Sequence, residues 1–240
     1  MTMKGGVCMS NSQAILKYIE KQPEAAVIIA RELYIKKFSN MTETAFLKNL
    51  ERLNKEEKIT RISKGVYCKP KKTRFGIISA GESDIVEYFL GENNKYGFEF
   101  GYRLYNKHKL TTQISKKIDI CTQKSNVENG TIKNITIKKL GAFYKPNMLS
   151  TIELLEILEN YHRIEDLNQK NFVKYCDYAV KEFNEKNFEQ LYKNLNYKKR
   201  TIAFLKQLLD FYGVSNGLKK YLNGTSKYKI PKVEQIHETA

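Results

Sequence analysis

The stretch ITRISKGVYCKPKK, residues 59–72, decides the fold of the first third of the chain. Residues 59–62 alternate apolar and polar side chains, as a half-buried strand does. Residues 63–65 have the composition of a turn in which Gly65 takes a positive φ. Residues 66–68 then read as the returning strand. We therefore expect a β-hairpin in this stretch.

Helical patterns precede this hairpin. Residues 12–22 carry apolar side chains on one face, and residues 27–38 carry a second apolar pattern. A third helix can be capped by Asn40 or Thr42. Its buried stripe is expected to consist of Phe46, Leu47, Leu50 and Leu53. Three helices followed by a hairpin is the order of a winged helix-turn-helix, which we predict for residues 10–74.

The remainder, residues 75–230, is predicted to form a mixed α/β domain with a helical C-terminal region. A helix is expected over residues 83–90, and strands over residues 98–100 and 132–140. Ser150 and Glu153 have the spacing of a capping box that would open a helix. Residues 201–212 form an amphipathic pattern that stops at Gly213. The predicted fold class is thus α+β.

Charge is the most informative feature of the composition. The 240 residues include 42 Lys and Arg against 26 Asp and Glu, a net charge of +16. Residues 1–75 alone hold 16 basic and 7 acidic side chains, more than half of the excess. A field of this size attracts nucleic acid or an acidic partner. The first third of the chain is therefore where we expect a polyanion to bind.

The candidate DNA-contacting residues fall in two sets. The first set is polar and lies on the expected outer face of the third helix, where such side chains can read base edges. Its members are Thr42, Thr44, Lys48, Asn49 and Arg52. The second set follows the hairpin, where no acid neutralises the cations and glycine permits close backbone approach to phosphate. Its members are Arg61, Lys64, Gly65, Lys69, Lys71, Lys72 and Arg74.

Alternatives to DNA contact remain open at this stage. An ordinary solvated helix face and a solubilising hairpin would have the same composition. Lys198, Lys199 and Arg200 stand where a helix begins, an unfavourable place for cations, which suggests a second phosphate patch. A basic interaction protein that binds RNA or an acidic protein partner is the main rival function.

Other classes of protein have little support in the sequence. No apolar run approaches the ~18 residues of a membrane span, and no signal-peptide core is present, so a cytoplasmic location is expected. The four cysteines and three histidines are scattered, so we expect no metal site, disulfide or cofactor. The strand expected over residues 132–140 has no acid for nuclease chemistry, and no Asp-x-Asp supports a nucleotidyltransferase. An enzyme is not expected.

An ordered set of residues resembles a known family. The N-terminal pattern consists of Leu50, Leu53, Lys55, Glu56, Ile59, Arg61, Gly65, Tyr67 and Pro70. It resembles the winged-helix N-terminus of AbiEi-type antitoxins from bacterial abortive-infection toxin–antitoxin systems. Residues 101–102 and 110–113 (LTTQ) look like the middle segment of that family, and residues 197–201 (YKKRT) and 218–229 look like its C-terminal part. The chain departs from the family at Glu57, Lys109 and Ser115, where glycine, glycine and proline are usual.

The resemblance implies a function. It implies a repressor of its own operon that binds double-stranded DNA at its operator. It also implies an antitoxin domain that neutralises a nucleotidyltransferase-like toxin encoded beside it, with or without stable binding of that toxin. Finally, it implies a nonenzymatic protein.

Overall fold

The computed structural model describes residues 10–124, 129–224 and 227–240. It combines helices with several small sheets and divides into two compact units, residues 1–89 and residues 90–240. The division falls near the end of one helix. The boundary expected between residues 74 and 75 lies inside the first unit, which also takes in the segment up to Phe89.

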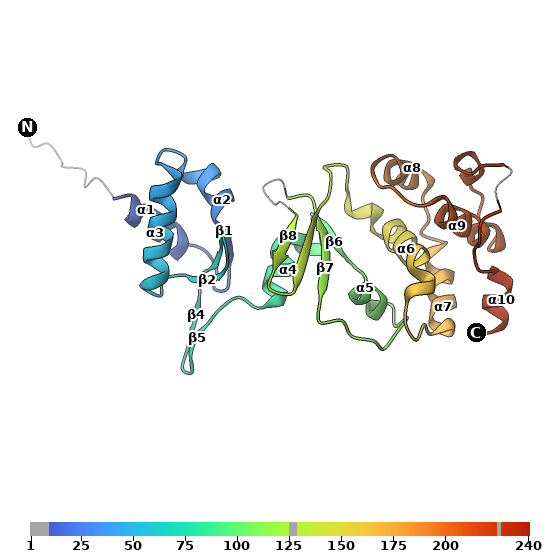
Figure 1. The fold of residues 1–240 in the computed structure, drawn as a ribbon, viewed down its shortest axis with the longest axis horizontal. Coiled ribbons are helices and arrows are strands. Elements are labelled where there is room, and N and C mark those ends of the chain that lie inside the picture. The colour runs from blue at the N-terminus through green and yellow to red at the C-terminus, as the bar shows by residue number, and fades with distance from the viewer. Residues whose placement is uncertain (1–9, 125–128, 225–226) are drawn as a thin grey trace, which may run out of the picture. The chain divides into compact units, whose positions relative to one another are not determined.

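The first unit alternates helices with short strands (Figure 1). Its helical elements are α1 (Asn11–Glu20), α2 (Ala30–Leu33), the π-helical η1 (Tyr34–Phe38), α3 (Glu43–Lys55) and α4 (Glu82–Leu90). Its strands are β1 (Val27–Ile29), β2 (Thr60–Ser63), β3 (Val66–Cys68), β4 (Lys71–Thr73) and β5 (Gly76–Ile78).

A three-stranded sheet in the order β1-β3-β2 holds this unit together. The expected hairpin is confirmed, because β2 and β3 pair antiparallel and Gly65 has φ 72° in the turn. The helix expected over residues 27–38 is partly wrong, since Val27–Ile29 forms β1. These three β-branched residues pair antiparallel with β3, Ile28 standing opposite Tyr67. Pairing with a strand 40 residues away overrides a locally helical pattern.

The helix α3 is confirmed with Thr42 as its N-cap. Phe46, Leu50 and Leu53 are buried as expected, but Leu47 is 37% exposed and was wrongly assigned to the stripe. The spacing i, i+4, i+7 defines a face too narrow to include it. Beyond α3, Glu57 takes the left-handed conformation with φ 56°, the conformation glycine would adopt at least cost.

The second unit contains a four-stranded sheet followed by helices. Its strands are β6 (Gly97–Phe100), β7 (Ile118–Thr122), β8 (Gly130–Ile132) and β9 (Ile135–Lys139). Its longer helices are α5 (Tyr102–Lys107), α6 (Leu149–Asn160), α7 (Gln169–Ala179), α8 (Glu185–Asn194), α9 (Lys199–Phe211) and α10 (Val233–Glu238). Single turns lie at η2 (Glu92–Asn94), η3 (Pro146–Met148), η4 (Tyr161–Arg163) and η5 (Leu218–Tyr221).

The sheet of the second unit has the order β6-β7-β9-β8, with only β7 and β9 parallel. The strand expected over residues 132–140 is confirmed for Ile135–Lys139 (β9) and wrong at its start, because β8 and β9 form a hairpin across Lys133 and Asn134. Lys133 turns the chain with φ 53°, and the Asn134 side chain donates to the Lys116 carbonyl at 2.5 Å. Lysine rarely adopts a positive φ, so the sequence does not indicate a turn at this position.

The central helix α6 is buried on most sides and packs against α7 and α9 (Figure 1). The capping box expected at Ser150 and Glu153 is wrong, because the turn η3 runs directly into α6 and leaves Ser150 inside the helix. Glu153 instead accepts from Lys107 Nζ at 2.6 Å and contacts His108 Nε2 at 2.9 Å. Its carboxylate therefore ties α6 to the end of α5.

No helix in the described ranges has both the length and the apolar composition needed to cross a membrane.

The Glu153 cluster should make stability depend on pH. Burial opposes ionisation, but the hydrogen bonds from His108 and Lys107 outweigh it and lower the pKa of Glu153 below its ordinary 4.5. Such a group stabilises the fold above its unfolded pKa, and that contribution is lost as the pH falls through the folded pKa. Glu153→Gln should cost about 1–3 kcal/mol of unfolding free energy at pH 7.

Urea unfolding from pH 7 to pH 3 measures this effect. The difference between wild type and Glu153→Gln should shrink as the pH falls from the ordinary pKa of 4.5 toward the lowered pKa of folded Glu153, below which the wild-type side chain is protonated too. Glu182→Gln, at an exposed position, should stay within about 0.5 kcal/mol of wild type. A difference that is constant with pH would contradict the assigned charge interaction.

Candidate nucleic-acid interface

The outer face of α3 is polar and partly cationic. Thr44, Lys48 and Arg52 are exposed along this helix, while Asn49 is half-buried. Within the described residues, no hydrogen bond or ion pair engages the Lys48 ammonium. The spacing of four between Thr44, Lys48 and Arg52 places them in one row on the helix. This row can be presented to a groove of a nucleic acid.

Three of the residues predicted for base contact also serve the helix itself. The Thr42 hydroxyl accepts from the Ala45 amide at 3.3 Å and caps α3. The Asn49 side chain donates to the Ala45 carbonyl at 2.8 Å. Arg52 donates to the Ser12 hydroxyl of α1 and lies 3.7 Å from the Glu56 carboxylate. Of the predicted set, Thr44 and Lys48 are therefore the members with exposed and uncommitted polar groups.

The β2–β3 hairpin presents exposed cations beside a docked turn. Arg61 and Lys64 are exposed, and the Arg61 amide is held by the Asn54 side chain at 2.8 Å. The Gly65 carbonyl accepts from the Ala30 amide at 2.9 Å, which fastens the turn to the start of α2. This hydrogen bond ties the turn to α2, with the exposed cation Lys64 in the turn and the exposed cation Arg61 before it.

Lys69 has a structural partner that the sequence did not reveal. Its ammonium donates to the carbonyls of Glu20 at 2.7 Å and Gln22 at 2.6 Å, just where α1 ends. Cations favour the C-terminal end of a helix, where carbonyls lack intrahelical donors. Lys69 therefore joins the returning hairpin to α1, and its charge is largely engaged there.

The last three predicted cations lie on or beside a separate two-stranded sheet formed by β4 and β5. Lys71, Lys72 and Arg74 are all exposed. The Arg74 guanidinium lies 4.7 Å from the centre of the Phe75 ring. Sequence reasoning missed Phe75, although an aromatic residue directly after the basic run that ends at Arg74 was a usable signal.

The basic run at residues 198–200 begins α9 in the second unit. The N-cap Lys198 forms an ion pair with Glu159 at 2.7 Å, and Lys199 donates to the Asn223 side chain at 2.5 Å. Burial raises the pKa of Glu159, but the hydrogen bonds from Lys198 and Thr201 outweigh it and lower that pKa overall. The Glu159 carboxylate thus explains why a cation can stand at this helix N-terminus. Arg200 is exposed.

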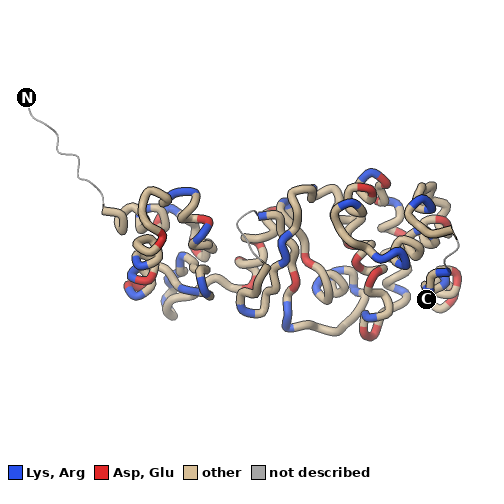
Figure 2. The backbone as a smooth tube through the Cα atoms, turned by 45° about the horizontal axis from the view of Figure 1, so that its top comes forward, with Lys and Arg blue, Asp and Glu red and all other residues tan. Residues whose placement is uncertain are grey.

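Charge is spread over both units, with Lys and Arg recurring throughout the tube in Figure 2. The first unit, residues 1–89, holds 16 basic and 10 acidic side chains (+6), and the second unit holds 26 and 16 (+10), so the excess per residue is similar in the two units. In the ranges described, no group of three or more His, Cys, Asp or Glu residues could hold a metal ion, and Cys68, Cys121 and Cys176 are free thiols.

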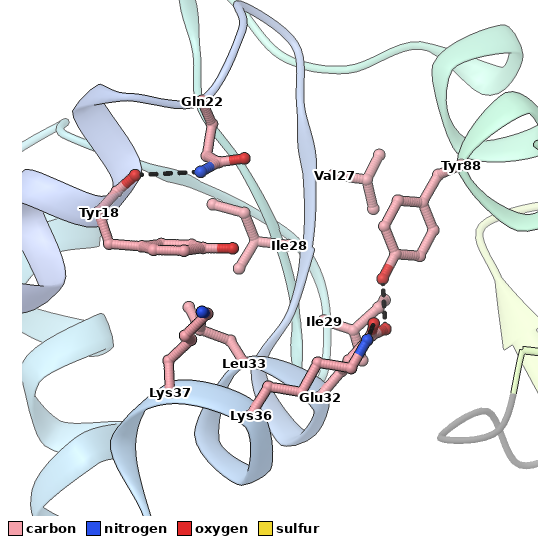
Figure 3. Close-up of a pocket in the computed structure, with 10 residues that line it drawn as sticks. All are labelled: Tyr18, Gln22, Val27, Ile28, Ile29, Glu32, Leu33, Lys36, Lys37 and Tyr88. Carbon is pink, nitrogen blue, oxygen red and sulfur yellow. Dashed lines mark hydrogen bonds and ion pairs between the residues drawn. The ribbon is translucent and has the colours of Figure 1, made fainter.

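The first unit also contains a pocket of about 180 Å³ (Figure 3). Tyr18 and Lys37 stand on one side of it, and Tyr88 of α4 closes the other. The Tyr88 hydroxyl donates to the Glu32 carboxylate at 2.6 Å, and Lys36 pairs with the same carboxylate at 2.5 Å. Burial and the Glu32 carboxylate raise the pKa of Tyr88, so it stays a neutral donor. This contact fastens α4 to α2.

We expect Lys69 and Lys64 to separate structural from free cations. Lys69→Met removes two charge-assisted hydrogen bonds and should lower the free energy of unfolding by about 1–3 kcal/mol. Lys64→Ala, at an exposed position, should leave it within about 0.5 kcal/mol of wild type. Urea unfolding monitored by circular dichroism measures both. If the two variants have equal free energies of unfolding, Lys69 does not stabilise the fold as assigned here.

Comparison with known proteins gives limited information. No family model matches the chain, and no curated protein matches it. A solved structure that resembles it is the crystal structure of the RV2827C protein from Mycobacterium tuberculosis. The two share 11% sequence identity with a TM-score of 0.44, over 86% of this chain and 78% of that one.

Proposed function

We propose that this chain binds double-stranded DNA through its N-terminal unit, which we interpret as a winged helix-turn-helix. In this interpretation α3 is the recognition helix and the β2–β3 hairpin is the wing. The observation that carries the proposal is the run of residues 61–74. It holds six cations and no acid, and of these Arg61, Lys64, Lys71, Lys72 and Arg74 are exposed directly after the polar face of α3.

The physical argument concerns repulsion. Like charges at this density repel one another unless counterions or a polyanion neutralise them. Duplex DNA carries regularly spaced phosphates, and each neutralised phosphate releases condensed counterions. Lys48 and Thr44 have the donors needed to contact base edges in the major groove, and Asn49 or Arg52 could join them by exchanging their present partners.

The proposal extends to the setting in which this DNA binding operates. Following the resemblance to AbiEi-type antitoxins, the chain acts in the cytoplasm as a repressor of its own operon. Its second unit then neutralises a nucleotidyltransferase-like toxin encoded beside it. Support for a separate task is that the second unit builds its own sheet and its own core around α6.

Duplex binding is tested by fluorescence anisotropy with DNA from upstream of the coding sequence and with a scrambled duplex. Lys64→Ala and Lys72→Ala should each weaken both duplexes alike and flatten the plot of log affinity against log salt by ~0.9. Lys48→Ala should instead reduce the preference for the upstream duplex by about 1–3 kcal/mol.

Lys181→Ala, an exposed cation of the second unit, is the matched control and should behave as wild type. If Lys48→Ala and Lys64→Ala have the same effect, the assignment of recognition helix and wing is wrong. Preference for single-stranded RNA over every duplex would favour the rival function.

The antitoxin function is tested by co-expressing the full chain with the adjacent toxin gene beside a promoter reporter. The double variant Lys64→Ala, Lys72→Ala should lose repression of the reporter, because both cations belong to the DNA-binding unit. It should still restore growth, because neutralisation is assigned to the second unit. Loss of growth rescue together with repression would show that the two tasks are not separate.

A further inference from the structure

The hairpin of β4 and β5 has apolar side chains that no part of the described core covers. Phe75 at its tip is 85% exposed, and Ile77 and Ile78 are 43% and 53% exposed. None of the three belongs to the buried cluster of the first unit. The hairpin projects beyond the three-stranded sheet (Figure 1), entered from the buried Pro70 and left toward the buried Ala80. A two-stranded hairpin of this kind is marginally stable in water without a partner.

The hairpin also carries a defined arrangement of charge. Lys71 stands opposite Ile78 and Lys72 stands opposite Ile77, so each face pairs a cation with an isoleucine. Residues 71–78 include no acid. The Arg74 guanidinium lies over the Phe75 ring, which sets the aromatic tip beside a cation. An exposed apolar tip on a hairpin whose only charged residues are cations is complementary to a surface that has both negative charge and apolar planes.

The turn fixes the direction of the tip. The Thr73 hydroxyl accepts from the Phe75 amide at 3.2 Å and donates to the Gly76 carbonyl at 2.9 Å. Gly76 has φ 120°, a conformation that side-chain-bearing residues rarely adopt. The conformation of residues 73–76 is thus specified locally, which places Phe75 at the tip of the hairpin.

We propose that this hairpin is a DNA wedge in which Phe75 inserts between stacked bases from the minor groove while Lys71, Lys72 and Arg74 contact the flanking phosphates. This inference rests on the proposed function and adds a second point of contact to it. Apolar side chains that enter a base step from the minor groove unstack it and kink the duplex. The undeformed minor groove is only about 6 Å wide, so the tip side chain is the part of the hairpin that we expect to reach the base step.

Duplex DNA suits these features better than other occupants. Duplex DNA combines apolar planes and negative charge in one ligand. Its stacked bases match Phe75 at the tip, and its phosphates match the cations Lys71, Lys72 and Arg74 beside the tip. Pyrimidine–purine steps such as TA unstack most easily, so the wedge should prefer them. An acidic protein or an anionic lipid surface would satisfy the cations and would also cover Phe75, but neither would be kinked or unstacked.

The test uses the whole 240-residue chain and a duplex of about 30 base pairs, which is longer than ~2 helical turns. The duplex carries 2-aminopurine at a central TA step and a dye at each end. Wild type should raise 2-aminopurine fluorescence several-fold and bring the dyes closer. Phe75→Ala should lose both signals and bind about tenfold more weakly, with its salt dependence unchanged, because no phosphate contact is removed. Phe75→Leu should retain part of the unstacking signal, since leucine also serves as a wedge.

Two controls separate the possible failures. Ile114→Ala removes an 87% exposed apolar side chain from the second unit and should leave every signal unchanged. If wild type binds the duplex but Phe75→Ala gives the same fluorescence and affinity, the wedge is refuted and the proposed function stands. If wild type binds no duplex, the proposed function fails and the wedge fails with it. Phe75-dependent binding to phosphatidylserine vesicles without any unstacking of DNA would also overturn the wedge.

Discussion

The first unit depends on the pairing of β3 along both of its edges. This short strand holds β2 on one side and β1 on the other, and its central residue Tyr67 reaches the core beneath α1 and α3. A strand of this length cannot form a stable sheet alone, so both neighbours are needed to satisfy its backbone groups. The double pairing fixes where α2 starts, where α3 ends and where the hairpin stands relative to them.

Cations in this chain divide into two physical classes. Lys69 and Lys198 stand close to carbonyls or a carboxylate and hold elements together at 2.6–2.7 Å. Lys48, Lys64 and Lys72 are exposed and lie on elements whose conformation is set by other residues. Only the second class contributes a charge that a ligand can neutralise without disturbing the fold. Some of the 42 Lys and Arg side chains are therefore engaged within the fold and are not available to a polyanion.

The elements of the proposed interface differ in how firmly the rest of the first unit holds them. The helix α3 packs Phe46 and Leu50 into the core and ends in a cap that includes the strained Glu57. The β2–β3 turn is fastened through Gly65 to α2. The β4–β5 hairpin, by contrast, is specified mainly by its own turn. In the proposed complex, the packed helix would fix the position of the protein on the duplex, and the less supported hairpin could adjust to a bend in it.

The sequence by itself determined the elements whose signals are local. The stripe of Phe46, Leu50 and Leu53, the cap at Thr42 and the glycine turn at Gly65 follow from side-chain spacing and backbone sterics, and each is present. The acid-free basic run was also visible, and so was the polar face of α3. These features depend on residues within a few positions of one another.

Only the tertiary structure decided the features that depend on distant partners. Val27–Ile29 forms a strand because it pairs with an edge of β3. Glu153 does not cap α6, because η3 continues into that helix, and its carboxylate instead contacts Lys107 and His108. Lys69 donates to the carbonyls of Glu20 and Gln22 because the fold places the end of α1 beside it. Phe75 became a candidate because nothing in the described core covers it. Pairing, burial and charge neutralisation act between residues far apart in the chain, and a linear pattern does not contain those distances.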